Sequence, residues 1–246
     1  MRAEVFAFIL AVFALAGFVK GVIGLGLPTI SMGLLALVMP PVEAAALLVL
    51  PSLLTNLWQM LRGPALGSSL KRLWPMMLAI CAGTLAAGGL MTGAYAPYMV
   101  ALLGLMLVLY ALSGFTTLRF SVPKRHEPWF GPLIGGTTGI VAAATGVFTI
   151  PAVPYLQAIG LEKDELVQAL GLSFTVSTLA LTANVARAGA FNGSIAGATL
   201  AALAASVGGM WIGQVLRSRL QPPAFRRWFF AGLLLLGLYL IAGAFR

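Results

Sequence analysis

The sequence predicts an all-α, polytopic membrane protein made of two inverted repeats, each with five hydrophobic segments. Hydrophobic residues make up 60% of the 246 residues, charged residues make up only 9%, and the mean hydropathy is +1.00. Soluble domains carry about 25% charged residues, so most of this surface must face lipid. The net charge of +9 is spread over short clusters between apolar stretches. This is typical of topology signals and argues against nucleic acid as a partner.

An internal repeat is the second observation. Gly26-Leu27-Pro28-Thr29-Ile30 opens one apolar stretch and Gly146-Val147-Phe148-Thr149-Ile150 opens another, and an acidic turn follows each stretch. The ends of the halves also match, because Leu109-Tyr110 with Gly114 corresponds to Leu238-Tyr239 with Gly243. A duplicated apolar chain with matching Gly and Pro interruptions is typical of secondary transporters. We expect a first repeat over 1–118, a linker over 119–129 and a second repeat over 130–246.

Apolar stretches define ten segments. They span about 5–20, 27–39, 43–61, 73–92 and 97–118 in the first half, and about 130–145, 147–159, 165–186, 194–217 and 224–243 in the second. A helix that crosses the hydrocarbon core needs about 20 residues. The second segment of each half covers only about 20 Å at 1.5 Å per residue. These two segments are therefore expected to be short or broken helices.

Basic clusters predict the orientation of these segments. They comprise Arg62, Lys71 and Arg72, then Arg119, Lys124 and Arg125, then Arg217, Arg219, Arg226 and Arg227. If all ten segments cross, the three clusters share one side, which the positive-inside rule makes cytoplasmic. Both termini then lie outside, with Arg187 as one exception. Five crossings per repeat is an odd number, so the halves are inverted. Eight crossings, with the short segments dipping in and returning, is the alternative.

Several motifs resemble one transporter family. In the first half they are Gly17-x-x-x-Gly21-x-x-Gly24-x-Gly26, the basic turn near Arg62, and Gly83-Thr84-Leu85-Ala86-Ala87-Gly88. In the second half they are Thr149-Ile150-Pro151 leading to Tyr155–Leu161, and Phe225-Arg226-Arg227 followed by Leu235–Leu240. Together they resemble the TauE/SafE family, the sulfite exporter family. Ala142-Ala143-Ala144-Thr145 departs from the resemblance, since more glycine is typical there.

This resemblance implies a multi-pass transporter of the bacterial or archaeal inner membrane. Its expected partners are the lipid bilayer and a small exported anion, namely sulfite, sulfoacetate or another organosulfonate. The middles of the segments hold no acidic residue, so we expect export to be driven by the membrane potential. A small-anion channel, a proton-coupled carrier of other small metabolites and an accessory membrane protein remain alternatives. The oligomeric state is left open.

The Gly-rich turns are the first candidate substrate site. Their candidate residues are Gly24, Gly26, Thr29, Thr145, Gly146 and Thr149. Pro28 and Pro151 suit the first turn of a helix, and free N–H groups at a helix start attract anions. Two such starts from inverted repeats can face each other near the membrane midplane. Alternatively, these glycines only permit close helix packing.

Polar residues within the apolar segments are the second group of candidates. Lys20 is either a buried functional residue or, as we favour, an interfacial lysine that snorkels to water. Asn56 and Ser177 belong to two polar sets, Ser52–Gln59 and Ser173–Asn184. Such side chains either bind substrate or join helices, and the second role is favoured. Gln168 shares this ambiguity.

The sequence does not predict an enzyme. His126 is the one histidine and Cys81 the one cysteine, so a metal site of the usual kind has too few ligands. His126 lies in a charged loop, and no Ser–His pair falls within the apolar segments. We expect neither a cofactor nor a metal.

Overall fold

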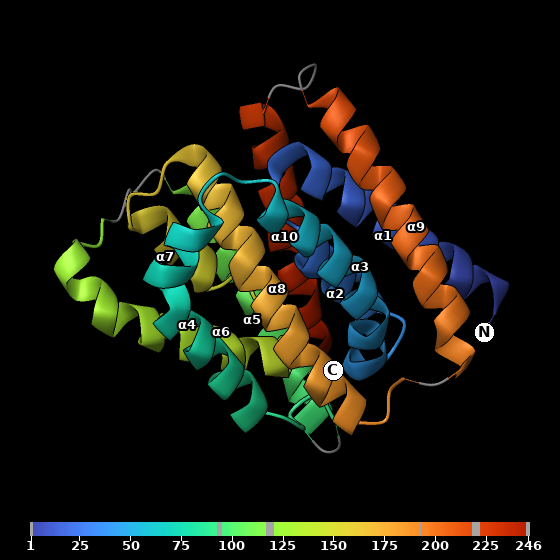
Figure 1. The fold of residues 1–246 in the computed structure, drawn as a ribbon. Coiled ribbons are helices and arrows are strands. Elements are labelled where there is room, and N and C mark those ends of the chain that lie inside the picture. The colour runs from blue at the N-terminus through green and yellow to red at the C-terminus, as the bar shows by residue number, and fades with distance from the viewer. Residues whose placement is uncertain (1, 93–94, 117–120, 192, 218–221, 245–246) are drawn as a thin grey trace.

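The computed structural model describes residues 2–92, 95–116, 121–191, 193–217 and 222–244. Within these residues it is helical with no strand (Figure 1). The first half contains α1 (Ala3–Ile23), α2 (Leu27–Leu35), α3 (Pro41–Leu61), α4 (Leu66–Ala86) and α5 (Ala96–Phe115). The second contains the 3₁₀ turn η2 (Lys124–His126), α6 (Glu127–Thr145), α7 (Ala152–Ala158), α8 (Lys163–Arg187), α9 (Gly193–Leu216) and α10 (Pro222–Ala244). The ten predicted segments each correspond to one α-helix.

The prediction of short second segments is confirmed. α2 has 9 residues and α7 has 7. α2 begins at Leu27 with Pro28 in its first turn, as expected. α7 begins only at Ala152, so Thr149 lies in the connection before it and not at a helix start.

The match between Gly26 and Gly146 needs correction. Gly146 ends α6 in the left-handed conformation, with φ 71°, just as Gly24 ends α1 with φ 79°. Each amide N–H closes the last helical turn, on Ala142 and Lys20 respectively. Only glycine adopts this conformation at low cost, so Gly24 is the structural counterpart of Gly146. The sequence match is based on the shared pattern Gly-x-x-Thr-Ile and pairs Gly26 with Gly146. It is therefore two residues out of register with the structure.

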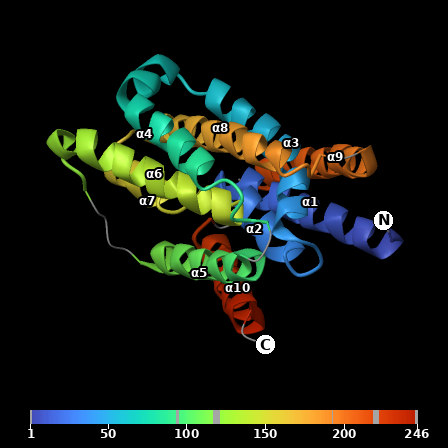
Figure 2. The same ribbon diagram turned by 90° about the horizontal axis from the view of Figure 1, so that it is seen from below.

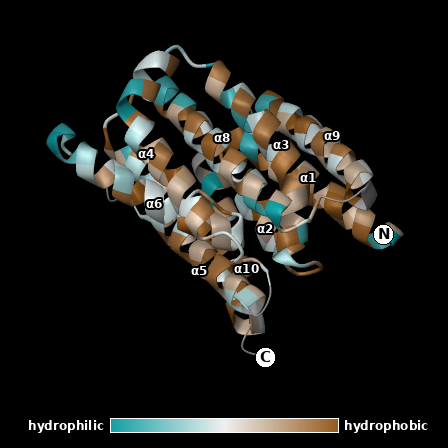
Figure 3. Cartoon of the chain, turned by 60° about the horizontal axis from the view of Figure 1, so that its bottom comes forward, coloured by the Kyte–Doolittle hydropathy of each residue, from teal (hydrophilic) through white to brown (hydrophobic). Residues whose placement is uncertain are grey.

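Six helices are long and apolar enough to cross a membrane: α1, α3, α8 and most of α5, α9 and α10. This search covers the described residues only. α4 is not among the six, and it carries Lys71 and Arg72 near its start; nor is the Gly- and Pro-rich α6. The chain is therefore a multi-pass membrane protein, and the number of crossings stays a prediction. In Figure 3 apolar residues cover the helix flanks and polar ones gather mainly near helix ends.

Four helix pairs dominate the packing. α1 lies along α9, α4 along α6, α3 along α8 and α5 along α10. α3 and α8 occupy the middle, with α1–α9 on one side of them and α4–α6 on the other (Figure 1). α5 and α10 form a separate layer beside these helices (Figure 2).

Glycines allow the outer pairs to approach closely. A Cβ on Gly21 would lie 2.3 Å from the Met210 carbonyl oxygen, and a Cβ on Gly139 would lie 2.3 Å from that of Ile80. Such contacts leave no room for a side chain, so α1–α9 and α4–α6 meet backbone to backbone, as helices do in membranes.

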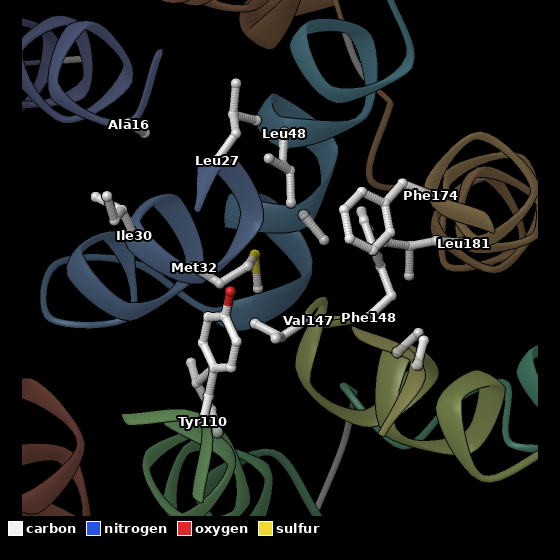
Figure 4. Packing of buried hydrophobic residues seen from close by; sticks show 14 of the residues in the cluster. Ala16, Leu27, Ile30, Met32, Leu48, Tyr110, Val147, Phe148, Phe174 and Leu181 are labelled. Atoms are coloured by element: carbon white, nitrogen blue, oxygen red, sulfur yellow. The ribbon is translucent and has the colours of Figure 1, made fainter. Parts of the chain in front are cut away.

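The core lies where α2 and the α6–α7 connection meet the central helices. Met32 of α2, Val147 and Phe148 of the α6–α7 connection, and Phe174 of α8 converge there (Figure 4). The rings of Phe148 and Phe174 pack against each other at a tilt, with their centroids 5.2 Å apart. Burial of these large side chains fixes the connection that follows α6 against α2 and α8.

Two polar contacts hold the helix ends together. Gln168 Nε2 donates to the carbonyls of Met60 (2.7 Å) and Gly63 (2.8 Å), and its Oε1 accepts from the Ala65 N–H (2.6 Å). Gln168 therefore joins α8 to the α3–α4 turn, which resolves its ambiguity in favour of helix joining.

Arg72 pairs with Glu127 at 2.7 Å and donates to the Ile159 carbonyl. The hydrogen bond from Arg72 to Glu127 raises the pKa of the guanidinium.

Candidate functional site

A polar cleft opens among α1, α3, α8 and α9. Its volume is about 450 Å³. It is lined by Lys20, Gly21 and Gly24 of α1 and its cap, Thr55, Trp58, Gln59, Arg62, Gly63 and Pro64 at the end of α3, Asp164 and Val167 at the start of α8, and Met210, Gln214 and Arg217 at the end of α9. A space of this size accommodates a small ligand.

Lys20 lies in the inner part of this cleft. Its side chain is 5% exposed, and Nζ donates to Thr55 Oγ1 at 3.0 Å and to Asn56 Oδ1. The favoured snorkelling interpretation is therefore wrong, because the ammonium turns toward α3 and not to the surface. Polar acceptors on α3 hold it there. An ammonium has three N–H donors, so these two bonds leave one donor for a ligand.

Asn56 connects Lys20 to the centre of the molecule. Its Nδ2 donates to Ser52 Oγ at 3.0 Å, and Ser52 Oγ lies 3.3 Å from Thr178 Oγ1 on α8. Thr55 Oγ1 donates to the Pro51 carbonyl at 2.7 Å, which leaves its lone pairs for Lys20. All four α3 and α8 side chains are buried. The network fixes both acceptors of Lys20.

The mouth of the cleft is also cationic. The Arg62 guanidinium lies 4.3 Å from the centroid of the Trp58 ring, and Arg217 faces it from α9. Asp164 is the one carboxylate among the lining residues. Lys20, Arg62 and Arg217 therefore outnumber the acidic groups, so the cleft attracts anions.

Of the nine candidate residues, the structure brings Lys20, Gly24 and Asn56 together at the cleft. Gly26 and Thr29 lie at the buried start of α2, where a Cβ on Gly26 would contact Val19 and Phe229 and Thr29 Oγ1 donates to the Gly26 carbonyl at 2.9 Å. None of the residues that line the cleft, all within the described ranges, belongs to α2 or α7. A substrate role for either short helix stays a prediction.

The remaining candidates lie in the second half. Thr145 Oγ1 donates to the Val141 carbonyl at 2.7 Å and accepts from the Val147 N–H. A Cβ on Gly146 would meet Met32, so this glycine packs against α2. Thr149 Oγ1 is buried and has no hydrogen-bond partner within the described part of the chain. Ser177 Oγ donates to the Ser173 carbonyl at 2.9 Å, within α8.

Sequence reasoning overlooked the mouth of the cleft. The sequence marks Arg62 and Arg217 only as topology signals, and it gives Trp58 and Gln214 no role. One signal was present, because Trp58 and Arg62 are four residues apart on a helix and such pairs face each other. Nothing in the sequence indicated that the end of α9 faces the end of α3.

A multi-pass helical bundle with a cationic cleft that leads to a buried lysine defines the class, a membrane transport protein. The family model described as "Sulfite exporter TauE/SafE" matches residues 9–240. The chain therefore belongs to the TauE/SafE family, as its motifs predicted. Comparisons with curated proteins and with solved structures return no match.

Proposed function

We propose that the chain exports a small sulfur-containing anion, namely sulfite, sulfoacetate or another organosulfonate, across the inner membrane. The observation that carries this proposal is Lys20. It is a buried ammonium that donates to Thr55 and Asn56, both of which are neutral. Burying a charge without a counter-ion is costly. A bound anion supplies that counter-ion.

The orientation proposed is the one that the loop charges predict. Arg62 and Arg217 lie at the mouth of the cleft, and the positive-inside rule places them in the cytoplasm. The cleft then faces the compartment from which an exporter takes its substrate. Arg119 and Arg219, which contribute to the same prediction, lie outside the described residues.

The helix pairing supports an inverted repeat. Exchanging each helix for its counterpart in the other half turns the α1–α9 pair into α6–α4 and leaves α3–α8 and α5–α10 as they are. A two-fold relation between the halves requires this pattern. We therefore propose repeats over 1–118 and 130–246, joined by a linker from which α6 begins at Glu127.

Transport assays test the proposal. Protein in proteoliposomes should catalyse saturable counterflow of labelled sulfite or sulfoacetate, which a channel does not do. Lys20→Met should abolish this counterflow, because it keeps the length of the side chain and removes the charge. The matched control is Lys71→Met, which removes an exposed cation near the start of α4. Equal counterflow by Lys20→Met and the unmodified protein would refute the role of Lys20.

A further inference from the structure

A second, much smaller pocket lies among α3, α4, α6 and α8. Its volume is about 20 Å³, room for about one water molecule. It is lined by Val42 at the start of α3, Gly89, Met91 and Thr92 after α4, Ala143 of α6, and Leu181, Asn184, Val185 and Ala188 at the end of α8. Apart from Asn184 and Thr92, its lining is apolar or glycine.

This pocket is the counterpart of the cleft. The cleft is bounded by α1, the end of α3, the start of α8 and the end of α9. Exchanging each helix for its counterpart gives α6, the end of α8, the start of α3 and the end of α4, which are the elements around the pocket. In an inverted repeat the two spaces face opposite sides of the membrane. One is about 450 Å³ and the other about 20 Å³.

Buried polar atoms remain unpaired at the small pocket. Asn184 Nδ2 donates to the Thr84 carbonyl at 2.6 Å, which joins α8 to α4. Among the residues that the structure describes, Asn184 Oδ1 and Thr84 Oγ1 are buried without a hydrogen-bond partner. Each unpaired group costs about 1–3 kcal/mol. Opening the pocket to water or to a polar ligand relieves this cost.

A line of polar side chains runs from the cleft into the interior, in the direction of the small pocket. From Lys20 it passes through Asn56 and Ser52 to Thr178. Thr182, whose Oγ1 donates to the Thr178 carbonyl at 2.7 Å, continues it along α8 toward Asn184. These groups offer an anion hydrogen bonds across the otherwise apolar interior.

We propose that the Asn184 pocket is the narrowed exit of the transport path. It widens outward when α4–α6 moves away from α3–α8 and the cleft closes, and the Thr84 hydroxyl and the second Nδ2–H of Asn184 then donate hydrogen bonds to the departing anion. The backbone contacts in the α1–α9 and α4–α6 pairs let each pair move as one body. This inference rests on the proposed function and adds to it an outer binding site and a gate.

Cysteine accessibility tests the exit. Leu181 and Val185 line the pocket and are each 1% exposed. In a Cys81→Ser background, Leu181→Cys or Val185→Cys should react with a membrane-impermeant maleimide from outside. The rate should rise at least several-fold while right-side-out vesicles export sulfoacetate, which unlike sulfite does not attack the reagent. The adduct should block export.

Two controls define the result. Leu103→Cys, also 1% exposed but on α5, should stay unreactive during export. Gln59→Cys, in the cleft, should react only in inside-out vesicles. If both pocket cysteines stay unreactive while the vesicles export sulfoacetate, the exit is wrong and the proposed function stands. If the unmodified protein exports neither sulfite nor sulfoacetate, the proposed function fails, and the exit with it.

Discussion

At the scale of single residues, Lys20 carries the functional argument. Its ammonium is held by two side chains on α3, and the network behind them extends to α8. Neutral acceptors stabilise the charge without neutralising it, so Lys20 keeps its attraction for an anion. A carboxylate in place of one of these neutral acceptors would neutralise the charge of Lys20 and remove that attraction.

Asn56→Asp tests this point directly. The new carboxylate would pair with Lys20 and compete with the substrate, so we expect a loss of transport of about tenfold or more, or at least about 1.4 kcal/mol. The protein should stay folded, because the pair is buried and hydrogen-bonded. Asn56→Ala is the comparison: it leaves Lys20 and Ser52 short of a partner and should cost about 1–3 kcal/mol in stability. Transport assays and melting temperatures separate the two effects, and full transport by Asn56→Asp would contradict the account.

The sequence identified Lys20 but not its surroundings. A lysine at the end of an apolar segment predicts either burial or snorkelling, and only its contacts decide between them. Thr55 and Asn56 are a polar pair on α3, and the sequence does not indicate which residue they contact. Their approach to Lys20 depends on how α1 and α3 are placed relative to each other, a tertiary relation that local patterns do not encode.

At the scale of elements, the close pairs α1–α9 and α4–α6 define the architecture. Both depend on glycines that face the backbone of the partner helix. The sequence showed that these glycines exist but not which helices they join. It located nearly every helix because apolar segments and basic turns have a direct signal. It misplaced the start of α7 because Gly146 ends α6 and does not open the next helix.

Gly21→Ala tests the close packing. Its Cβ would lie 2.3 Å from the Met210 carbonyl oxygen, and a backbone atom moves aside only at a cost. We expect a loss of stability of about 1–3 kcal/mol, measured as a lower melting temperature in detergent. Gly136→Ala is the matched control on α6, where the Cβ meets no heavy atom within 4 Å. Equal melting temperatures for the two variants would show that α1 and α9 do not pack as described.

At the scale of the whole molecule, the fold combines a membrane-spanning bundle with a large polar cleft and a small, mainly apolar pocket. The sequence predicted the bundle and the family, because composition and repeated motifs extend over the whole chain. It did not predict either space. Each space is formed by four helices, two from each half of the chain, so it depends on how the two halves pack together.

We expect the membrane potential to drive export without a proton carrier. The middles of the membrane segments hold no acidic residue. Moving one negative charge outward across an inside-negative membrane releases about 2.3 kcal/mol per 100 mV, equivalent to roughly a fifty-fold concentration ratio. In substrate-loaded liposomes, a potassium–valinomycin potential that is negative inside should accelerate efflux, and a pH gradient alone should have little effect. Efflux that follows the pH gradient and ignores the potential would instead indicate proton coupling.

Direct binding tests the central claim, that the cleft binds a small anion through Lys20. Sulfite and sulfoacetate should be titrated calorimetrically into purified unmodified protein, Lys20→Met and Lys71→Met in detergent. The account predicts saturable binding of at least one of the two anions to the unmodified protein and to Lys71→Met with similar affinity, and binding at least about tenfold weaker, by about 1.4 kcal/mol, to Lys20→Met. The same affinity for all three proteins, or binding of neither anion to any of them, would contradict it.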